Sequence, residues 1–206
     1  AKKLYTNYWY KSGVNESMRM ALAGIAEKVE TVTGLGAGDL VLDIGCNDGI
    51  TLNAYEVPGL VRVGVEPSRV SQMARNAGLD VIGSFFNADI SKQIIAKYGQ
   101  ARVITATNVF AHVDDMHSFI AGIHPLLCDD GVFVVEVAYL IDLIDNNLFD
   151  TIYHEHLCYF SLCSMNNLLG MHGLSIYDIG RSPISGGSWV VYFSKEFKEK
   201  TVRLRN

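Results

Sequence analysis

Short apolar runs alternate with amphipathic stretches along most of this chain. Five β-branched, apolar runs predict buried strands, at residues 40–44, 60–65, 79–82, 101–106 and 132–137. Uninterrupted apolar strands of this kind are typical of a parallel sheet that is covered on both faces. Ahead of the first strand, Met18, Leu22, Ile25 and Val29 share one face of a predicted helix, with Asn15 as its N-cap.

Helical patterns also separate the later strands and continue after the fifth. They cover residues 68–77, 114–127, 139–149 and 161–172. The first of these ends at Gly78, a candidate left-handed C-cap. Two final strands, 174–179 and 188–194, are joined by a stretch rich in Gly, Pro and Ser. This order predicts an α/β fold with a Rossmann-like, doubly wound sheet of seven strands and a terminal antiparallel hairpin.

Composition narrows the possible partners. The 206 residues carry a net charge of −5, and the one basic tract is the short stretch 195–205, so nucleic-acid binding is not expected. The sequence contains no apolar run of about eighteen residues and no signal-peptide pattern, which predicts a soluble, cytoplasmic protein without membrane contact. The four cysteines form no CxxC pair, which argues against a disulfide framework and a zinc ribbon within these residues.

A glycine-containing turn follows the first predicted strand. It reads DIGCNDG at residues 43–49, and Glu66 ends the second strand 23 residues after Asp43. A carboxylate at this distance can accept hydrogen bonds from both hydroxyls of a ribose. Asn47 stands where a dinucleotide fingerprint needs glycine, which favours a ligand that has a ribose but no pyrophosphate. The alternative is that the two glycines only serve a turn between strand and helix.

Ionisable side chains gather in the tetrapeptide Tyr153-His154-Glu155-His156, and His112 follows the fourth predicted strand. In a doubly wound sheet both segments reach the same carboxyl-end edge. Three interpretations compete: a metal site, a structural histidine cluster, and general acid–base chemistry. The spacing is not HExxH, and an imidazole is suited to removing a proton near neutral pH, so acid–base chemistry is favoured and no metal is expected.

The turn at 43–49 together with Glu66 resembles the cofactor motif of the class I methyltransferases, which use S-adenosylmethionine. The whole chain resembles the sugar C-methyltransferases of deoxysugar and antibiotic pathways. The matching stretches are residues 8–13, 43–49, 64–68, 107–113, 153–156 and 186–187. The resemblance implies methylation of a carbon next to the ketone of a nucleotide-linked deoxysugar. His156 would remove the proton, and the resulting enolate would attack the methyl group.

The resemblance also assigns roles to individual residues. His156 would be the base, Tyr153 and Glu155 would position it or the substrate, His112 would be a further active-site residue, and Tyr10, or else Tyr8, would face the sugar. The residues expected to bind the cofactor are Asp43, Gly45, Cys46, Asn47, Gly49, Glu66, Pro67, Phe85, Thr107 and Asn108. Phe85 or its neighbour Phe86 would cover the adenine, while Thr107 and Asn108 would lie at the reacting end.

The chain also departs from the family. Family members carry an amino-terminal four-cysteine zinc module and a carboxyl-terminal domain, so the resemblance implies a core domain without them. The expected organisation is a substrate-facing segment 1–34, a cofactor-binding domain 35–195 and a charged tail 196–206. Ser185 and Val190 replace a histidine and an arginine that the family often has beside Gly186-Gly187. Two other functions stay open: an O-methyltransferase, and a cofactor-binding module without catalysis.

Overall fold

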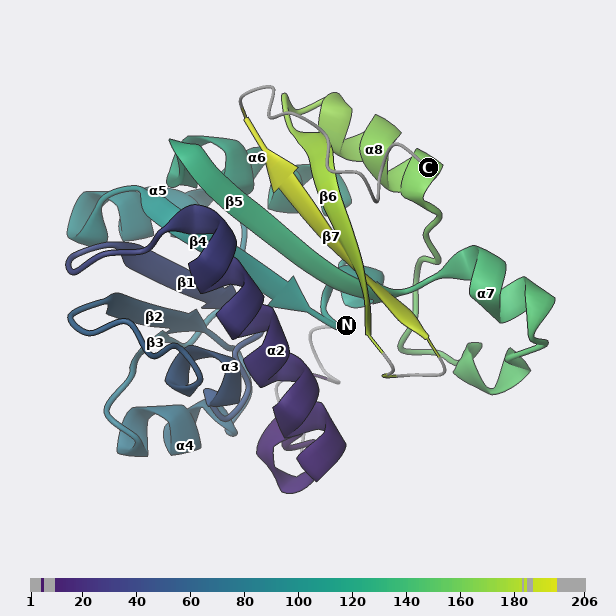
Figure 1. Cartoon of the computed structure of the whole chain (residues 1–206), viewed down its shortest axis with the longest axis horizontal. Helices are drawn as coiled ribbons and strands as arrows, with labels where there is room; N and C mark the ends of the chain where they lie inside the picture. The colour runs from purple at the N-terminus through teal and green to yellow at the C-terminus, as the bar shows by residue number, and fades with distance from the viewer. Residues whose placement is uncertain (1–4, 6–9, 183, 185–186, 196–206) are drawn as a thin grey trace.

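The fold is a seven-stranded sheet with helices on both faces (Figure 1). The computed structural model describes residues 5, 10–182, 184 and 187–195. Its strands are β1 (Leu40–Ile44), β2 (Val61–Val65), β3 (Asp80–Ile82), β4 (Ala101–Thr107), β5 (Leu127–Ala138), β6 (Ser175–Ser182) and β7 (Ser188–Ser194). Its α-helices are α2 (Glu16–Thr33), α3 (Ile50–Asn53), α4 (Ser71–Asn76), α5 (Ala88–Tyr98), α6 (Met116–Leu126), α7 (Leu140–Asp145) and α8 (Leu162–Gly170).

The strand order is β3-β2-β1-β4-β5-β7-β6. The first five strands are parallel, and β7 lies antiparallel between β5 and β6. The predicted doubly wound sheet with a terminal antiparallel hairpin is therefore confirmed. From β1 the chain adds β2 and β3 on one side of the sheet and then crosses back to add β4 and β5 on the other. This reversal of strand order leaves a crevice beyond the carboxyl ends of β1 and β4, where ligands bind in this class of fold.

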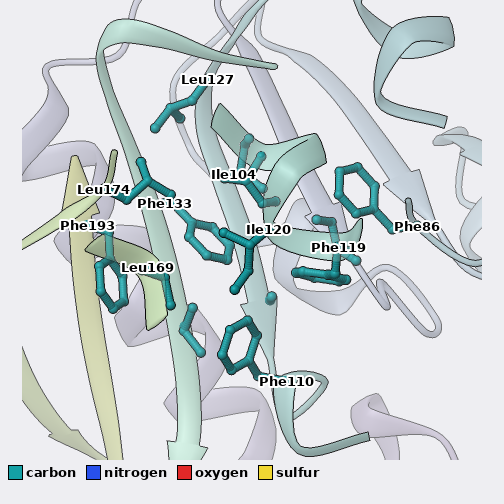
Figure 2. Packing of buried hydrophobic residues seen from close by; sticks show 14 of the residues in the cluster. Phe86, Ile104, Phe110, Phe119, Ile120, Leu127, Phe133, Leu169, Leu174 and Phe193 are labelled. Carbon is teal, nitrogen blue, oxygen red and sulfur yellow. The ribbon is translucent and has the colours of Figure 1, made fainter. Parts of the chain in front are cut away.

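Two apolar clusters hold the helices on the sheet. On one face, α2, α3 and α4 contribute Leu22, Val29, Leu52 and Ala74. On the other face, α5, α6 and α8 supply a larger cluster. Figure 2 shows the middle of this second cluster, in which Ile120 of α6 lies between Phe133 of β5 and Phe110. Strands buried on both faces explain why the sequence pattern of the first five is continuous rather than alternating.

Several helix boundaries agree with the sequence patterns, and others differ. Asn15 caps α2 by accepting hydrogen bonds from the backbone N–H groups of Ser17 and Met18, as predicted, and Gly78 has the expected positive φ of 87°. The predicted helix 139–149 is shorter: α7 ends at Asp145, and a 3-10 turn follows at Phe149–Thr151. Helix α5, which Asn87 caps, was not among the predicted helices. The predictions for Tyr8, Ser185, Gly186 and the tail 196–206 concern positions outside the described residues.

Helix α2 is part of the same core as the sheet. Leu22 and Val29 belong to one cluster with Val41 of β1 and Val103 of β4. In Figure 1 this helix crosses the near face of the sheet, beside β1 and β4. The segment that precedes the predicted boundary at residue 34 is thus packed on the domain that follows it.

Candidate active site

A cavity of about 830 Å³ lies at the carboxyl ends of the parallel strands. The turns that follow β1, β2 and β4 form one side of it, and the segment from Leu148 to Tyr159, which connects α7 to α8, forms another. Tyr5 and Tyr10 line it from the amino-terminal side. Segments far apart in the sequence meet here because the carboxyl ends of parallel strands share one edge of the sheet.

Glu66, a predicted cofactor residue, lines this cavity. Its Oε2 accepts a hydrogen bond from the backbone N–H of Asn47 at 3.1 Å, and its Oε1 accepts one from the backbone N–H of Ser68 at 2.8 Å. The residue is 7% exposed and lines the cavity. Two backbone donors fix the carboxylate in place, and its remaining lone pairs can accept the two hydroxyls of a ribose.

The turn after β1 needs glycine at two positions. Gly45 has a φ of 72°, and a Cβ atom there would lie 2.3 Å from Cγ2 of Val109. Gly49 has a φ of 82°, and its Cβ would lie 2.4 Å from Cδ1 of Leu79. Asn47 adopts a positive φ of 52° between them. Because side chains at 45 and 49 would be both strained and in collision, these glycines are required by the backbone.

Most predicted cofactor residues line the large cavity, but three do not. Those that line it are Gly45, Asn47, Glu66, Pro67, Phe85, Thr107 and Asn108. Cys46 lines only a small adjoining pocket of about 40 Å³, together with Tyr10, Thr107 and Asn108. Asp43 and Gly49 line neither the large cavity nor the small pocket. Phe86 lines the cavity but is 8% exposed and packs edge-on against Phe119 at 5.2 Å, so most of its surface belongs to the core.

Asp43 is a buried support of the turn. It is 1% exposed, and its Oδ1 accepts a 2.6 Å hydrogen bond from the hydroxyl of Thr105 on the neighbouring strand. Burial raises the pKa of this carboxyl from 3.8 to about 7; the hydroxyls of Thr105 and Thr51 oppose the increase, and the charge of Glu66 adds to it. Asp43 therefore changes its charge in the physiological range, directly beneath the cofactor turn.

We expect Asp43→Asn to flatten the pH dependence of stability. Because the folded-state pKa lies above the unfolded-state pKa, the proton on Asp43 stabilises the fold fully below about pH 4, and this stabilisation is lost as the pH rises through about 7. Asparagine can still accept from Thr105 but does not ionise. The wild-type free energy of unfolding should therefore fall by about 1–3 kcal/mol more than that of the variant between about pH 5 and 8. Urea denaturation at both pH values measures this, and equal decreases would contradict it.

Asn108 is held in the cavity wall by hydrogen bonds to the buried residue Glu136. It has a positive φ of 55°, its Nδ2 donates to Oε2 of Glu136 at 2.9 Å, and its backbone N–H donates to the Glu136 carbonyl at 2.9 Å. Glu136 is fully buried in β5, and burial raises the pKa of its carboxyl. Two bonds from one buried residue fix the orientation of the Asn108 amide in the cavity wall.

Two histidines from different segments, His112 and His156, meet in the lining of the cavity. The ring centroids of His112 and His156 lie 5.0 Å apart. Nδ1 of His112 lies 2.8 Å from the carbonyl oxygen of Glu155, and Nδ1 of His156 lies 2.8 Å from the carbonyl oxygen of Thr151. Burial, together with the neighbouring His156, lowers the pKa of His112, while the Glu155 carbonyl opposes this. His112 is therefore neutral at physiological pH.

Tyr153 contacts the imidazole of His156. Its hydroxyl lies 3.1 Å from Nε2 of His156, and the two ring centroids are 4.3 Å apart. Burial, reinforced by the nearby Glu155 and Tyr159, raises the pKa of Tyr153, which keeps its phenol protonated at neutral pH. Glu155 itself does not line the cavity, although its backbone carbonyl positions His112.

Other residues line the acceptor side that the sequence patterns did not single out. Tyr5 lies with its ring 5.4 Å from that of His112, and Thr151 and Tyr159 flank His156. Thr151 acts through its backbone carbonyl, which leaves no mark in the sequence. Tyr159 stands three residues after His156, so its proximity to the histidine-rich tetrapeptide was the available signal.

Residues 16–179 match the family model of a methyltransferase domain. The chain belongs to this family. The methyltransferase domain is also 36% identical over 201 residues to the C-methyltransferase NovU of Streptomyces niveus, covering 97% of this chain and 48% of that protein. It is 33% identical over 128 residues to sphingolipid C9-methyltransferase A of Emericella nidulans, covering 58% of this chain and 24% of that protein. The chain thus spans about half or less of the length of these curated relatives.

Solved structures with the same fold include two methyltransferases. Magnesium protoporphyrin IX methyltransferase of Synechocystis PCC 6803, with bound SAH, has a TM-score of 0.61 at 15% identity, over 93% of this chain and 91% of that chain. An S-adenosylmethionine-dependent methyltransferase of Clostridium acetobutylicum ATCC 824 has a TM-score of 0.64 at 13% identity, over 85% and 91%. The family match confirms the predicted methyltransferase domain.

None of the helices among the described residues is both long and apolar enough to span a bilayer. Within the same residues, His, Cys, Asp and Glu side chains do not gather in groups of three or more that could hold a metal ion.

Proposed function

We propose that this methyltransferase domain methylates a carbon next to the ketone of a nucleotide-linked deoxysugar, with His156 as the base that forms the enolate. The observation that carries this proposal is the 2.8 Å contact between Nδ1 of His156, at the cavity wall, and the carbonyl oxygen of Thr151. A carbonyl oxygen can only accept a hydrogen bond, so Nδ1 of His156 carries the hydrogen that points to Thr151. Its Nε2 therefore holds the lone pair, as a general base requires.

The Tyr153 hydroxyl first occupies this lone pair through a hydrogen bond and, once displaced by the acceptor, can donate to the acceptor's ketone. In the structure its hydroxyl is 3.1 Å from Nε2 of His156, where it donates to the basic nitrogen. An acceptor whose C–H approaches Nε2 displaces this hydroxyl. The displaced phenol, which its raised pKa keeps protonated, can then donate to the ketone oxygen, on which negative charge develops as the proton leaves.

The residues on the other side fit S-adenosylmethionine. Glu66 is fixed by two backbone donors with lone pairs left for a ribose, and Asn47 in the turn avoids the glycine-rich cradle that a pyrophosphate would need. When bound, this cofactor supplies an activated methyl group. The contribution of the chain is to hold the acceptor carbon in line with that group and to exclude water, which accounts for much of the rate in such reactions.

Similarity to a C-methyltransferase supports the proposed acceptor class, and the charges in the cavity lining limit which part of the acceptor can lie there. NovU, the 36% identical relative, is named as a C-methyltransferase. Among the described residues that line the cavity, the charged side chains are acids, Glu66, Asp114, Asp115 and Asp150, without a Lys or Arg. A diphosphate is normally bound by cations. We therefore place only the keto-sugar ring in the cavity and leave the diphosphate outside its described lining.

Exchange of solvent deuterium tests the proposal. The protein is incubated in D₂O with a nucleoside-diphosphate keto-deoxysugar and S-adenosylhomocysteine, which fills the cofactor side without a transferable methyl group. We expect deuterium at the carbon next to the ketone, detected by NMR, with the wild type and not with His156→Gln. In a parallel reaction with S-adenosylmethionine, methylation of a hydroxyl instead of that carbon would overturn the proposal in favour of an O-methyltransferase. If the protein catalyses neither deuterium exchange nor methyl transfer to any acceptor, it is a binding module without catalysis.

A further inference from the structure

Asn47 contacts both sides of the site. Its backbone N–H donates to Oε2 of Glu66, the acid expected at the ribose. Its side-chain amide points the other way, toward the segment of residues 10–14. There Nδ2 donates to the carbonyl of Tyr10 at 2.9 Å, and Oδ1 accepts from the backbone N–H of Ser12 at 3.1 Å. One residue thus joins the cofactor acid to the segment that carries Tyr10.

The next residue adds a second attachment. Oδ2 of Asp48 accepts the backbone N–H of Gly13 at 2.9 Å. The contact is close: a Cβ atom on Gly13 would lie 2.7 Å from the same oxygen. Residues 10–13 are therefore fastened to the cofactor turn through their backbone, by two adjacent side chains that come from 35 or more positions later in the chain.

The chemistry at position 47 is specific to asparagine. The amide supplies a donor for Tyr10 and an acceptor for Ser12 at the same time, and Oδ1 also accepts the N–H of Asp48 at 3.0 Å. Glycine would accept the positive φ but supply neither group. Aspartate would supply the acceptor alone and would set a carboxylate oxygen against the Tyr10 carbonyl. Asparagine also tolerates the φ of 52° better than most residues.

We propose that Asn47, with Asp48, is a positioning residue that couples cofactor binding to the placement of segment 10–14 and hence of Tyr10 on the acceptor side. A ribose bound to Glu66 restrains the carboxylate, the carboxylate restrains the Asn47 backbone, and the amide side chain restrains the backbone of Tyr10 and Ser12. Tyr10 lines both the large cavity and the small adjoining pocket, so its position shapes the space left for the acceptor. The role of Tyr10 rests on the proposed function, whereas the coupling itself requires only cofactor binding.

Hydrogen exchange measures the coupling without catalysis. The backbone amides of Ser12 and Gly13 are bonded to Asn47 and Asp48, so their exchange rates report directly on the attachment. In the wild type we expect saturating S-adenosylmethionine to slow exchange of these two amides by about tenfold or more. An unchanged rate at both amides on cofactor binding would overturn the proposal, whatever the acceptor proves to be.

Asn47→Gly removes the side chain and keeps both the positive φ and the N–H that binds Glu66. At saturating S-adenosylmethionine, cofactor binding should change the exchange of Ser12 and Gly13 by less than about twofold in this variant. The matched control is Asn147→Gly, the same substitution at the same φ of 52° in an exposed position. The control should behave as the wild type. A full cofactor response in Asn47→Gly would contradict the proposal.

A second variant approaches the contact from the other partner. Gly13→Ala leaves the cofactor turn unchanged but places a methyl group against Asp48. We expect it to reproduce the uncoupled exchange of Ser12 and, once the acceptor is known, to raise KM for the acceptor by about tenfold. A full cofactor response at Ser12, or an unchanged KM for the acceptor, would contradict a positioning role.

Discussion

His156→Gln should lower kcat by about 10²- to 10⁴-fold, the usual contribution of a general base, while the affinity for S-adenosylmethionine stays within about threefold. Glutamine can keep a donor near the Thr151 carbonyl, but its side chain has no basic nitrogen to replace Nε2. His156 lines the acceptor side of the cavity, and Glu66, Asn47 and their contacts lie on the other, so cofactor binding has no reason to fail. Single-turnover kinetics with a keto-sugar nucleotide, together with calorimetric titration of the cofactor, separate the two effects.

The same tetrapeptide supplies the control. His154 is exposed and does not line the cavity, although it is only two positions from His156. His154→Gln should therefore keep kcat within about twofold of the wild type. Equal losses in both variants would mean that the segment as a whole is required and that His156 has no special role. Unchanged turnover in His156→Gln would exclude it as the base.

Glu66→Ala should weaken S-adenosylmethionine binding by about 100-fold or more. The variant loses two charge-assisted hydrogen bonds to the ribose, each worth about 1.5–3 kcal/mol. It also leaves the backbone N–H groups of Asn47 and Ser68 without their acceptor, which loosens the turn. Glu66→Gln should bind more weakly than the wild type and more tightly than Glu66→Ala, because one acceptor oxygen remains.

Calorimetric titration with S-adenosylmethionine and S-adenosylhomocysteine, with NAD as a control ligand, measures these affinities. Glu27→Ala, at an exposed position on α2, removes the same kind of side chain away from the site and should leave both affinities unchanged. Full cofactor affinity in Glu66→Ala would show that the acid does not contact the ribose. Binding of NAD by the wild type would contradict the interpretation of the turn at residues 43–49.

Much of the fold was determined by local sequence signals. The apolar runs predicted the five parallel strands, and Asn15 and Gly78 marked helix ends through side-chain capping and positive φ. The turn at Gly45 and Gly49 and the acid Glu66 directly after β2 predicted a site for a ribose-bearing cofactor, and the structure places a cavity beside them. These signals are readable because each depends on neighbouring residues: periodicity, a cap or a turn leaves a pattern within a few positions.

Only the tertiary structure decided how the rest of the site is assembled. The spacing placed Asp43 and Glu66 in one motif, but Asp43 is bonded to Thr105 behind the turn while Glu66 faces the cavity. The pairing of His112 with His156 and the fixing of both Nδ1 atoms depend on the carbonyls of Glu155 and Thr151. Backbone carbonyls are present at every residue, so no sequence pattern distinguishes the ones that act here.

The attachment of segment 10–14 to Asn47 and Asp48 is likewise a product of the folded chain. The sequence showed that position 47 is not glycine, and the structure shows what the amide does there. Contacts between residues 35 or more positions apart depend on how the sheet brings distant turns to one edge. The sequence by itself therefore determined most of the elements and the turn with its following acid, but not helix α5. Which side chains face the cavity and which support it from behind was decided by long-range packing, because a residue's environment is set by neighbours that are not adjacent to it in the chain.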